Sequence, residues 1–120
     1  MLKIRLGKLD TSVEKLKLVP SQEILRLLHI APASVDASLS WTETNKTRTL
    51  TVSYENEMEF ETVITYSKEF PYVIQGWSES FTKGGKRHTS TAKLKTVQML
   101  PYWSMNSSSY DKVRKEIGLE

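Results

Sequence analysis

The chain has 120 residues, with 17 Lys and Arg against 14 Asp and Glu, three Trp and no Cys. A domain of this size buries roughly two thirds of its unfolded surface, so residues 1–120 are predicted to form a single domain without a disulfide or metal staple. The absence of Cys excludes disulfides, thiolate nucleophiles and Cys-rich zinc sites. The formal charge of +3, with acids interleaved along the chain, argues against specific nucleic-acid binding.

The N-terminal segment shows neither a signal peptide nor a membrane span. Charged residues interrupt every apolar run of MLKIRLGKLDTS, and no stretch of the chain approaches the roughly 20 apolar residues of a spanning helix. Residues 2–9 and 13–19 alternate in polarity and are compatible with one or two strands. The segment PSQEILRLLH, residues 20–29, predicts a short helix with Ser21 as N-cap and with Ile24, Leu27 and Leu28 on its apolar face.

The central part of the chain has the period of two residues that is typical of strands. Apolar and polar residues alternate over 35–42, 49–54 and 58–66, and the polar segments ETNKT and ENE separate these runs. A fourth strand is expected to begin near Pro71, and a long loop with Gly84 and Gly85 to follow it. A fifth strand, residues 89–100, changes phase between Leu94 and Val97, which suggests a bulge. Short turns between consecutive strands predict an antiparallel meander.

The C-terminal segment predicts a helix that packs on this sheet. Ser108 and Asp111 are spaced as in a capping box, and Gly118 stands where a left-handed C-cap belongs. Tyr110, Val113 and Ile117 form an apolar stripe, so the helix is expected to be integral to the fold. The predicted fold class is therefore α+β: an antiparallel β-meander of about five to seven strands with a short N-terminal helix and a C-terminal helix packed on the sheet.

Few residues suggest catalytic or metal chemistry. The only histidines, His29 and His88, lie far apart in the sequence, so no metal site and no cofactor are predicted. His29 suits the end of a helix. The Ser-rich segment NSSSYD lacks a nucleophile motif, and KGGKRH lacks the order of a phosphate-binding loop. We therefore predict a chain that is not an enzyme, while a hydrolase with an unrecognised site stays as a remote alternative.

Two aromatic-rich segments, FPYVIQGWSESF and PYWSMNSSSY, are the best candidates for a ligand site. Buried aromatic side chains dominate the energetics of small domains, so core packing is the default interpretation. In the alternative, the indoles line a cleft beside charged groups. The candidate ligand-binding residues are then Trp77, Glu79, Lys95, Tyr102 and Trp103.

Several of these segments together resemble a family of bacterial envelope lipoproteins. The similar segments are KLKLVPSQEILRLLH, RTLTVSY, KEFPYVIQGW, TSTAKLKT and YWSMNSSSYDKVRKEIGLE. Some members carry the label "septum formation inhibitor Maf", which we judge misleading because Maf proteins are nucleotide pyrophosphatases of a larger α/β fold. The family's lipid-attachment signal peptide and upstream region have no counterpart in this sequence. The resemblance implies the C-terminal domain of a larger lipoprotein, or a shortened relative.

The expected function is that of a non-enzymatic interaction or structural module of a bacterial cell-envelope lipoprotein. The alternative is a small-ligand-binding domain that uses the segments around Trp77 and Trp103. The partner is expected to be a protein or another envelope component, and the chain itself a monomer. The resemblance implies the periplasmic side of the cell envelope, whereas the missing signal peptide leaves the cytoplasm as the alternative.

Overall fold

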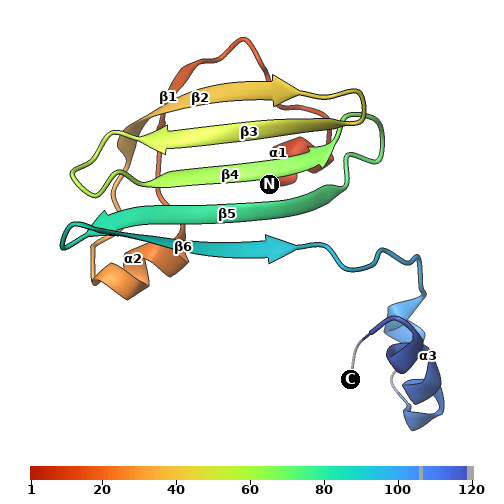
Figure 1. The fold of residues 1–120 in the computed structure, drawn as a ribbon. Coiled ribbons are helices and arrows are strands. Elements are labelled where there is room, and N and C mark those ends of the chain that lie inside the picture. Colours follow the sequence, from red (N-terminus) through yellow and green to blue (C-terminus); the bar gives the residue numbers. More distant parts are fainter. Residues whose placement is uncertain (106, 119–120) are drawn as a thin grey trace.

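The computed structural model describes residues 1–105 and 107–118, and its centre is a six-stranded antiparallel sheet. The strands follow one another in sequence order, β1-β2-β3-β4-β5-β6, as a meander (Figure 1). This arrangement confirms the predicted fold class. The strands are β1 (Lys15–Leu18), β2 (Val35–Glu43), β3 (Thr47–Tyr54), β4 (Glu61–Ser67), β5 (Ile74–Lys83) and β6 (Lys86–Lys93). The helices are α1 (Leu2–Arg5), α2 (Gln22–Leu28), the 3-10 turns η1 (Tyr102–Ser104) and η2 (Ser108–Tyr110), and α3 (Asp111–Glu116).

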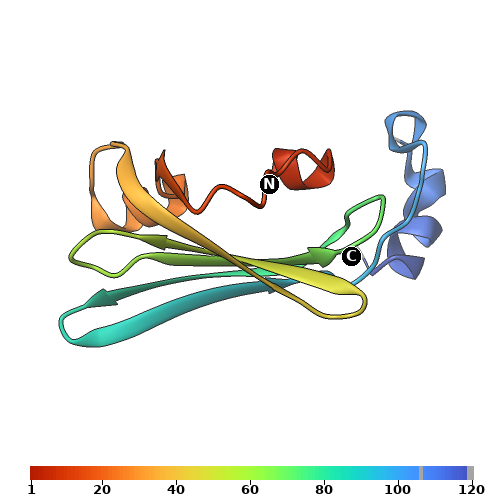
Figure 2. The ribbon, with the colours of Figure 1, turned by 90° about the horizontal axis from the view of Figure 1, so that it is seen from above.

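The core lies on one face of the sheet, which we call the covered face. The alternation in each strand places its apolar residues there, and the register aligns them across strands, with Leu39 opposite Val52 and Leu50 opposite Ile64. Both α1 and α2 lie on this side of the sheet, and no described helix lies over the opposite side (Figure 2). The meander therefore buries one face only, which is common for antiparallel sheets.

The N-terminal segment is a helical turn, so of the two candidate strands at residues 2–9 and 13–19 only the second forms. Ile4 of α1 is only 3% exposed and joins the core cluster of the sheet. The chain then turns at Gly7, whose φ of +62° places it in the left-handed region. A Cβ at this position would lie 2.7 Å from the Tyr72 ring, so the close approach requires glycine. The second predicted strand is present as β1, which pairs with β2.

Helix α2 begins and ends as the sequence predicts. The Ser21 hydroxyl accepts a hydrogen bond from the Ile24 amide over 3.3 Å, and His29 closes the helix in a left-handed conformation. The buried face differs from the predicted one. Ile24 and Leu25 are buried, whereas Leu27 is exposed.

The β5–β6 hairpin differs from the prediction in three respects. Gly84 and Gly85 form a two-residue turn with positive φ rather than a long loop. The bulge lies in β5, where Gln75 is skipped between the Thr65–Gly76 and Tyr66–Ile74 pairs, and β6 ends at Lys93. Pro71 belongs to the β4–β5 connection, since β5 begins only at Ile74.

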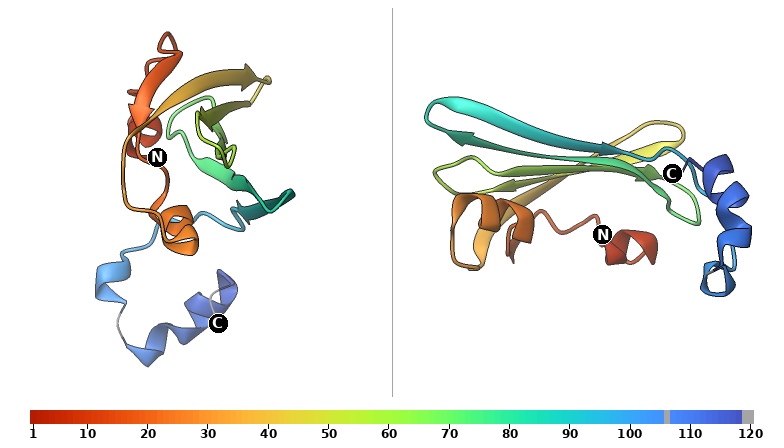
Figure 3. Two further views of the ribbon diagram at one scale, coloured as in Figure 1. Left: turned by 90° about the vertical axis from the view of Figure 1, so that its left-hand side faces the viewer. Right: turned by 90° about the horizontal axis from the view of Figure 1, so that it is seen from below.

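The described residues after Lys93, which we call the C-terminal arm, extend away from the sheet (Figures 1 and 3). Helix α3 packs chiefly against η2, and the expectation that it packs on the sheet is therefore wrong. Its stripe residues Tyr110, Val113 and Ile117 are only half-buried. The radius of gyration is 17.4 Å, whereas a compact chain of this length has about 14 Å. The projecting arm accounts for this difference.

Candidate functional site

The structure brings together two of the five predicted site residues. Trp77 and Glu79 lie two positions apart on β5, and their side chains share the covered face. Trp77 is half-buried, packs against the core cluster and stands opposite Ile64 and Ala92. Lys95 and Trp103 belong to the C-terminal arm, where Trp103 is 70% exposed. Tyr102 begins η1, and its side chain lies outside the described part of the structure. The two aromatic segments therefore do not form one site.

Glu79 anchors helix α2 to the sheet. The Ser21 hydroxyl donates to Glu79 Oε2 over 2.9 Å, and Ser21 Oγ accepts from the Ile24 amide. Tyr54 lies near this carboxylate: burial raises the pKa of Tyr54, a hydrogen bond with Thr62 lowers it, and the Glu79 charge raises it further. These contacts give the Glu79 carboxylate a structural role under α2.

The opposite face of the sheet consists chiefly of small hydroxyl side chains. The register aligns them in rows across the strands, as in Ser40–Thr51–Val63–Ser78–Thr91. One pair of neighbouring hydroxyls across strands is in contact: Thr49 Oγ1 lies 3.2 Å from Thr65 Oγ1. We call this surface the hydroxyl face; its Ser and Thr members are Ser38, Ser40, Thr42, Thr49, Thr51, Ser53, Thr65, Ser67, Ser78, Ser80, Thr82, Thr89 and Thr91.

The hydroxyl face was not predicted from the sequence, although its signal is present. Most Ser and Thr residues of the strands occupy the polar positions of the alternation that identified the core; Thr62 and Ser90 lie on the covered face. The polar residues of an alternating strand ordinarily indicate only that this side of the strand faces solvent. Lys and Glu occur at such positions as well as Ser and Thr. That five neighbouring strands carry the same small side chains on one face becomes clear only from the strand register.

A shallow depression of 380 Å³ interrupts the hydroxyl face at Gly76. Thr65 and Lys93 flank Gly76 in the same row, and Ser78 and Thr91 belong to the next. Gly76 is required for the close approach of two backbones, because a Cβ there would lie 2.9 Å from the Ala92 carbonyl oxygen. The depression therefore results from the tight contact between β5 and β6 beside the bulge.

One ion-pair cluster lies on the hydroxyl face. The Arg87 guanidinium donates to Ser80 Oγ over 2.5 Å and lies 3.5 Å from Glu61 Oε1. The arginine thus reaches back from β6 across β5 to β4. The charge of Arg87 is therefore largely offset within the sheet. Ser80, its hydrogen-bond partner, is only 7% exposed and is the most buried polar residue of the hydroxyl face.

A second charged cluster lies beside α1, at the opposite edge of the core. Glu43 accepts hydrogen bonds from Lys68 and Arg48, and both interactions lower the pKa of its carboxyl group. A cavity of 260 Å³ adjoins Arg48 and Lys68 and is also lined by Tyr66 and Tyr72. Because Glu43 pairs with both cations, the cluster stabilises the sheet end, while two cations against one carboxylate leave it net positive.

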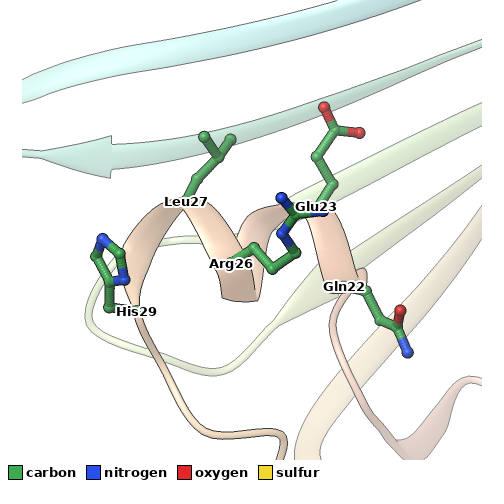
Figure 4. A pocket seen from close by; sticks show the side chains of 5 residues that line it. All are labelled: Gln22, Glu23, Arg26, Leu27 and His29. Carbon is green, nitrogen blue, oxygen red and sulfur yellow. The ribbon is translucent and has the colours of Figure 1, made fainter.

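A depression of 610 Å³ is formed by one helix alone. Gln22, Glu23, Arg26, Leu27 and His29 line it, and all of them belong to α2 or its C-cap. Figure 4 shows that these side chains point in different directions and do not converge on a common point. This surface has no constellation for binding a small molecule.

The described residues give no metal centre and no membrane helix. Among them, no three His, Asp or Glu side chains gather closely enough to hold a metal ion. His29 caps α2, and His88 stacks on Phe81 with ring centroids 5.2 Å apart. No helix in the described part of the chain is long and apolar enough to cross a bilayer.

Comparison with known proteins adds no relative. No family model, no curated protein and no solved structure matches the chain. The site must therefore be interpreted from its own geometry, and the resemblance to envelope lipoproteins stays a prediction.

Proposed function

We propose that the chain is a non-enzymatic interaction module of a bacterial cell-envelope lipoprotein, which holds a partner protein against the uncovered side of its sheet. The observation that carries the proposal is the one-sided sheet. Helices α1 and α2 cover one face, whereas the hydroxyl face extends over five strands without a described element above it (Figure 2).

The chemistry of the hydroxyl face suits a protein partner. Each Ser or Thr hydroxyl donates one hydrogen bond and accepts others, so the surface can match polar groups of either kind. These side chains are short and lose little rotamer entropy when they are covered. A rigid sheet also holds its hydroxyl groups in fixed rows, which lowers the ordering cost of association.

The envelope location is supported by the resemblance of the segments around Phe70 to Trp77 and Tyr102 to Ser107. On this proposal the partner is a protein of the periplasmic side. The alternative location is the cytoplasm, and the crosslinking experiment described next distinguishes the two locations.

The test is photo-crosslinking in the native host, with a photoreactive amino acid at Ser40 on the hydroxyl face. The matched control carries the same group at Arg26, which is equally exposed but lies on α2. We expect a discrete adduct from position 40, absent from position 26, and its mass-spectrometric identification as an envelope protein. No discrete adduct from position 40, or the same adducts from both positions, would refute the interaction module. A discrete cytoplasmic adduct would refute only the envelope location.

The depression at Gly76 favours a second candidate, a small-ligand-binding domain. It adjoins the backbone of Trp77, whose indole lies on the covered face, and Thr65, Ser78 and Thr91 supply polar groups around it. Native mass spectrometry of the chain purified from its host tests this function. A small molecule that copurifies with the wild type and is lost in Ser78→Trp, but retained in Ser40→Trp, would support it; a ligand-free spectrum would reject it.

A further inference from the structure

Strand β6 leaves one of its edges without a partner strand. It is the last strand of the sheet and pairs only with β5 (Figure 1). The Leu94 amide donates to the Gln75 carbonyl over 2.8 Å, which sets the alternation of the antiparallel ladder. The N–H and C=O groups that point away from β5 are therefore those of Arg87, Thr89, Thr91 and Lys93. Such a row is a template for an added strand.

This edge carries positive charge. The sequence has no acidic residue between Glu79 and Asp111. Lys86 and Lys93 stand at the two ends of β6, are exposed, and form no ion pair with a described residue. Arg87 is turned back toward Glu61 and contributes little to the edge. An incoming strand therefore meets a lysine at each end of β6.

The cations of this edge oppose pairing with a second copy of the chain. Opposite residues of an antiparallel pair lie on the same face of the sheet, so a twofold pair centred on Ser90 would place Arg87 of one copy opposite Lys93 of the other, and every register would bring two basic edges together. Like charges directly opposite each other destabilise a strand pair, and edge lysines are a common protection against self-association. The occupant of this edge is thus a different chain, and its charge must be negative where β6 is positive.

The covered side of β6 adds a preference for an apolar residue. Phe60, Phe81 and His88 form an aromatic row: the first two rings meet edge to face at 6.2 Å, and Phe81 stacks on His88 at 5.2 Å. His88 ends this row at the open edge and is exposed. A residue opposite His88 on an added strand would continue the row and cover the imidazole.

We propose that β6 binds an extended acidic segment of another protein, which pairs with it as a seventh strand. The segment carries Asp or Glu opposite Lys86 and Lys93, and an aromatic or apolar residue opposite His88. Main-chain hydrogen bonds supply affinity in this mode of recognition, and the alternating side chains supply specificity. The inference rests on the proposed interaction module and names the chemistry of its partner.

The first test uses the full chain and a synthetic peptide of sequence Glu-Val-Thr-Val-Thr-Phe-Thr-Glu, which matches the eight residues of β6. In antiparallel pairing its first residue lies opposite Lys93 and its Phe opposite His88. Amide chemical shifts of the protein are followed by NMR during titration at physiological salt. We expect saturable shifts that are largest at Thr89 and Thr91; no binding would overturn the proposal.

Three control ligands separate strand pairing from simple charge attraction: two modified peptides and a single-stranded oligonucleotide. One peptide has Lys in place of both Glu residues, and the other is N-methylated at the third and fifth residues, whose N–H groups would face β6. We expect both changes to weaken binding at least about tenfold, which corresponds to about 1.4 kcal/mol. Undiminished binding of either peptide, or tighter binding of a single-stranded oligonucleotide, would overturn the proposal.

Variants of β6 provide the reciprocal test. Thr91→Pro removes an N–H that faces solvent and is not part of the β5 ladder, so the fold is retained while the added strand loses a hydrogen bond. Thr91→Val is the matched control and keeps the N–H. The double variant Lys86→Glu, Lys93→Glu should bind the Lys peptide more tightly than the Glu peptide. If Thr91→Pro lowers the melting temperature, this double variant provides the test instead. An unchanged preference for the Glu peptide would overturn the proposal.

The outcomes distinguish this inference from the proposed function. A discrete crosslinked partner at Ser40 together with failure of the acidic peptide would retain the interaction module and reject β6 as its acidic-strand site. Absence of the crosslinked partner would reject the module itself.

Discussion

The Ser21 hydroxyl donates a hydrogen bond to the Glu79 carboxylate over 2.9 Å, although 58 residues separate the two in sequence. This contact ties the N-terminus of α2 to β5, the next-to-last strand of the sheet. Since Ser21 also caps the helix by accepting from the Ile24 amide, one hydroxyl group serves both the helix and its attachment.

Ser21→Ala should therefore destabilise the protein beyond the loss of a cap. Removal of an N-cap hydroxyl costs about 1 kcal/mol, and the part-buried Glu79 loses a donor, for a total of about 2 kcal/mol. Urea unfolding measures the difference. Ser34→Ala, at an exposed loop position, is the control and should change the free energy of unfolding by less than about 0.5 kcal/mol. Equal effects of the two substitutions would contradict the anchoring role.

The two tryptophans of the aromatic segments should differ in their contribution to stability. Trp77 is half-buried against the core, so Trp77→Ala should cost about 2–3 kcal/mol, somewhat below the value for a fully buried ring. Trp103→Ala should change stability by less than about 0.5 kcal/mol, because the ring is largely exposed. Denaturant titration of both variants gives the comparison, and a Trp103→Ala cost equal to that of Trp77→Ala would be incompatible with this structure.

Tryptophan emission should reveal the same difference in exposure. Trp103 is 70% exposed, whereas Trp41 and Trp77 pack against the core cluster. An aqueous quencher such as acrylamide should therefore act mainly on Trp103. In Trp103→Phe, the remaining emission should be blue-shifted and less readily quenched than in the wild type; Trp77→Phe is the matched comparison and should show the opposite change.

A chain that ends at Lys95 should fold without η1, η2 and α3 of the C-terminal arm. The arm's helix packs on η2 rather than on the sheet, and the Thr96 hydroxyl bonds to the Ile117 carbonyl, so these contacts are lost together. Cooperative thermal unfolding, followed by circular dichroism, should persist. Deletion of residues 1–9 is the contrasting control, because it removes Ile4 from the core and should strongly lower the melting temperature. A truncated chain without a cooperative transition would show that the arm supports the sheet.

Tyr54 should make stability decrease at alkaline pH. Burial raises its folded-state pKa above the ordinary value, with the Glu79 charge acting in the same direction. The neutral phenol is thus favoured in the folded state, and its stabilising contribution is complete below the unfolded pKa and is lost as pH rises through the folded pKa. The wild type should therefore lose stability relative to Tyr54→Phe from about pH 10 upward. Urea unfolding at pH 8 and above measures this difference, and a constant difference across the range would contradict the prediction.

The sequence by itself determined the class of fold because strand alternation and hairpin turns are local properties. The runs over 35–42, 49–54 and 58–66 identified three strands, and the Ser21 cap identified α2. The pairing of Trp77 with Glu79 on one face was also predictable, since residues two positions apart on a strand lie on the same side of the sheet.

The tertiary structure alone decided which surfaces are covered and which stay open. An apolar stripe such as Tyr110, Val113 and Ile117 shows that a helix can pack against another element. It does not identify that element, because the choice depends on contacts between residues distant in sequence. In the same way, the period of two residues cannot place the bulge at Gln75, align the hydroxyl groups of five strands, or attach Glu79 to Ser21. Those relationships depend on strand register and on where α1 and α2 lie, and both follow from the packing of the whole chain.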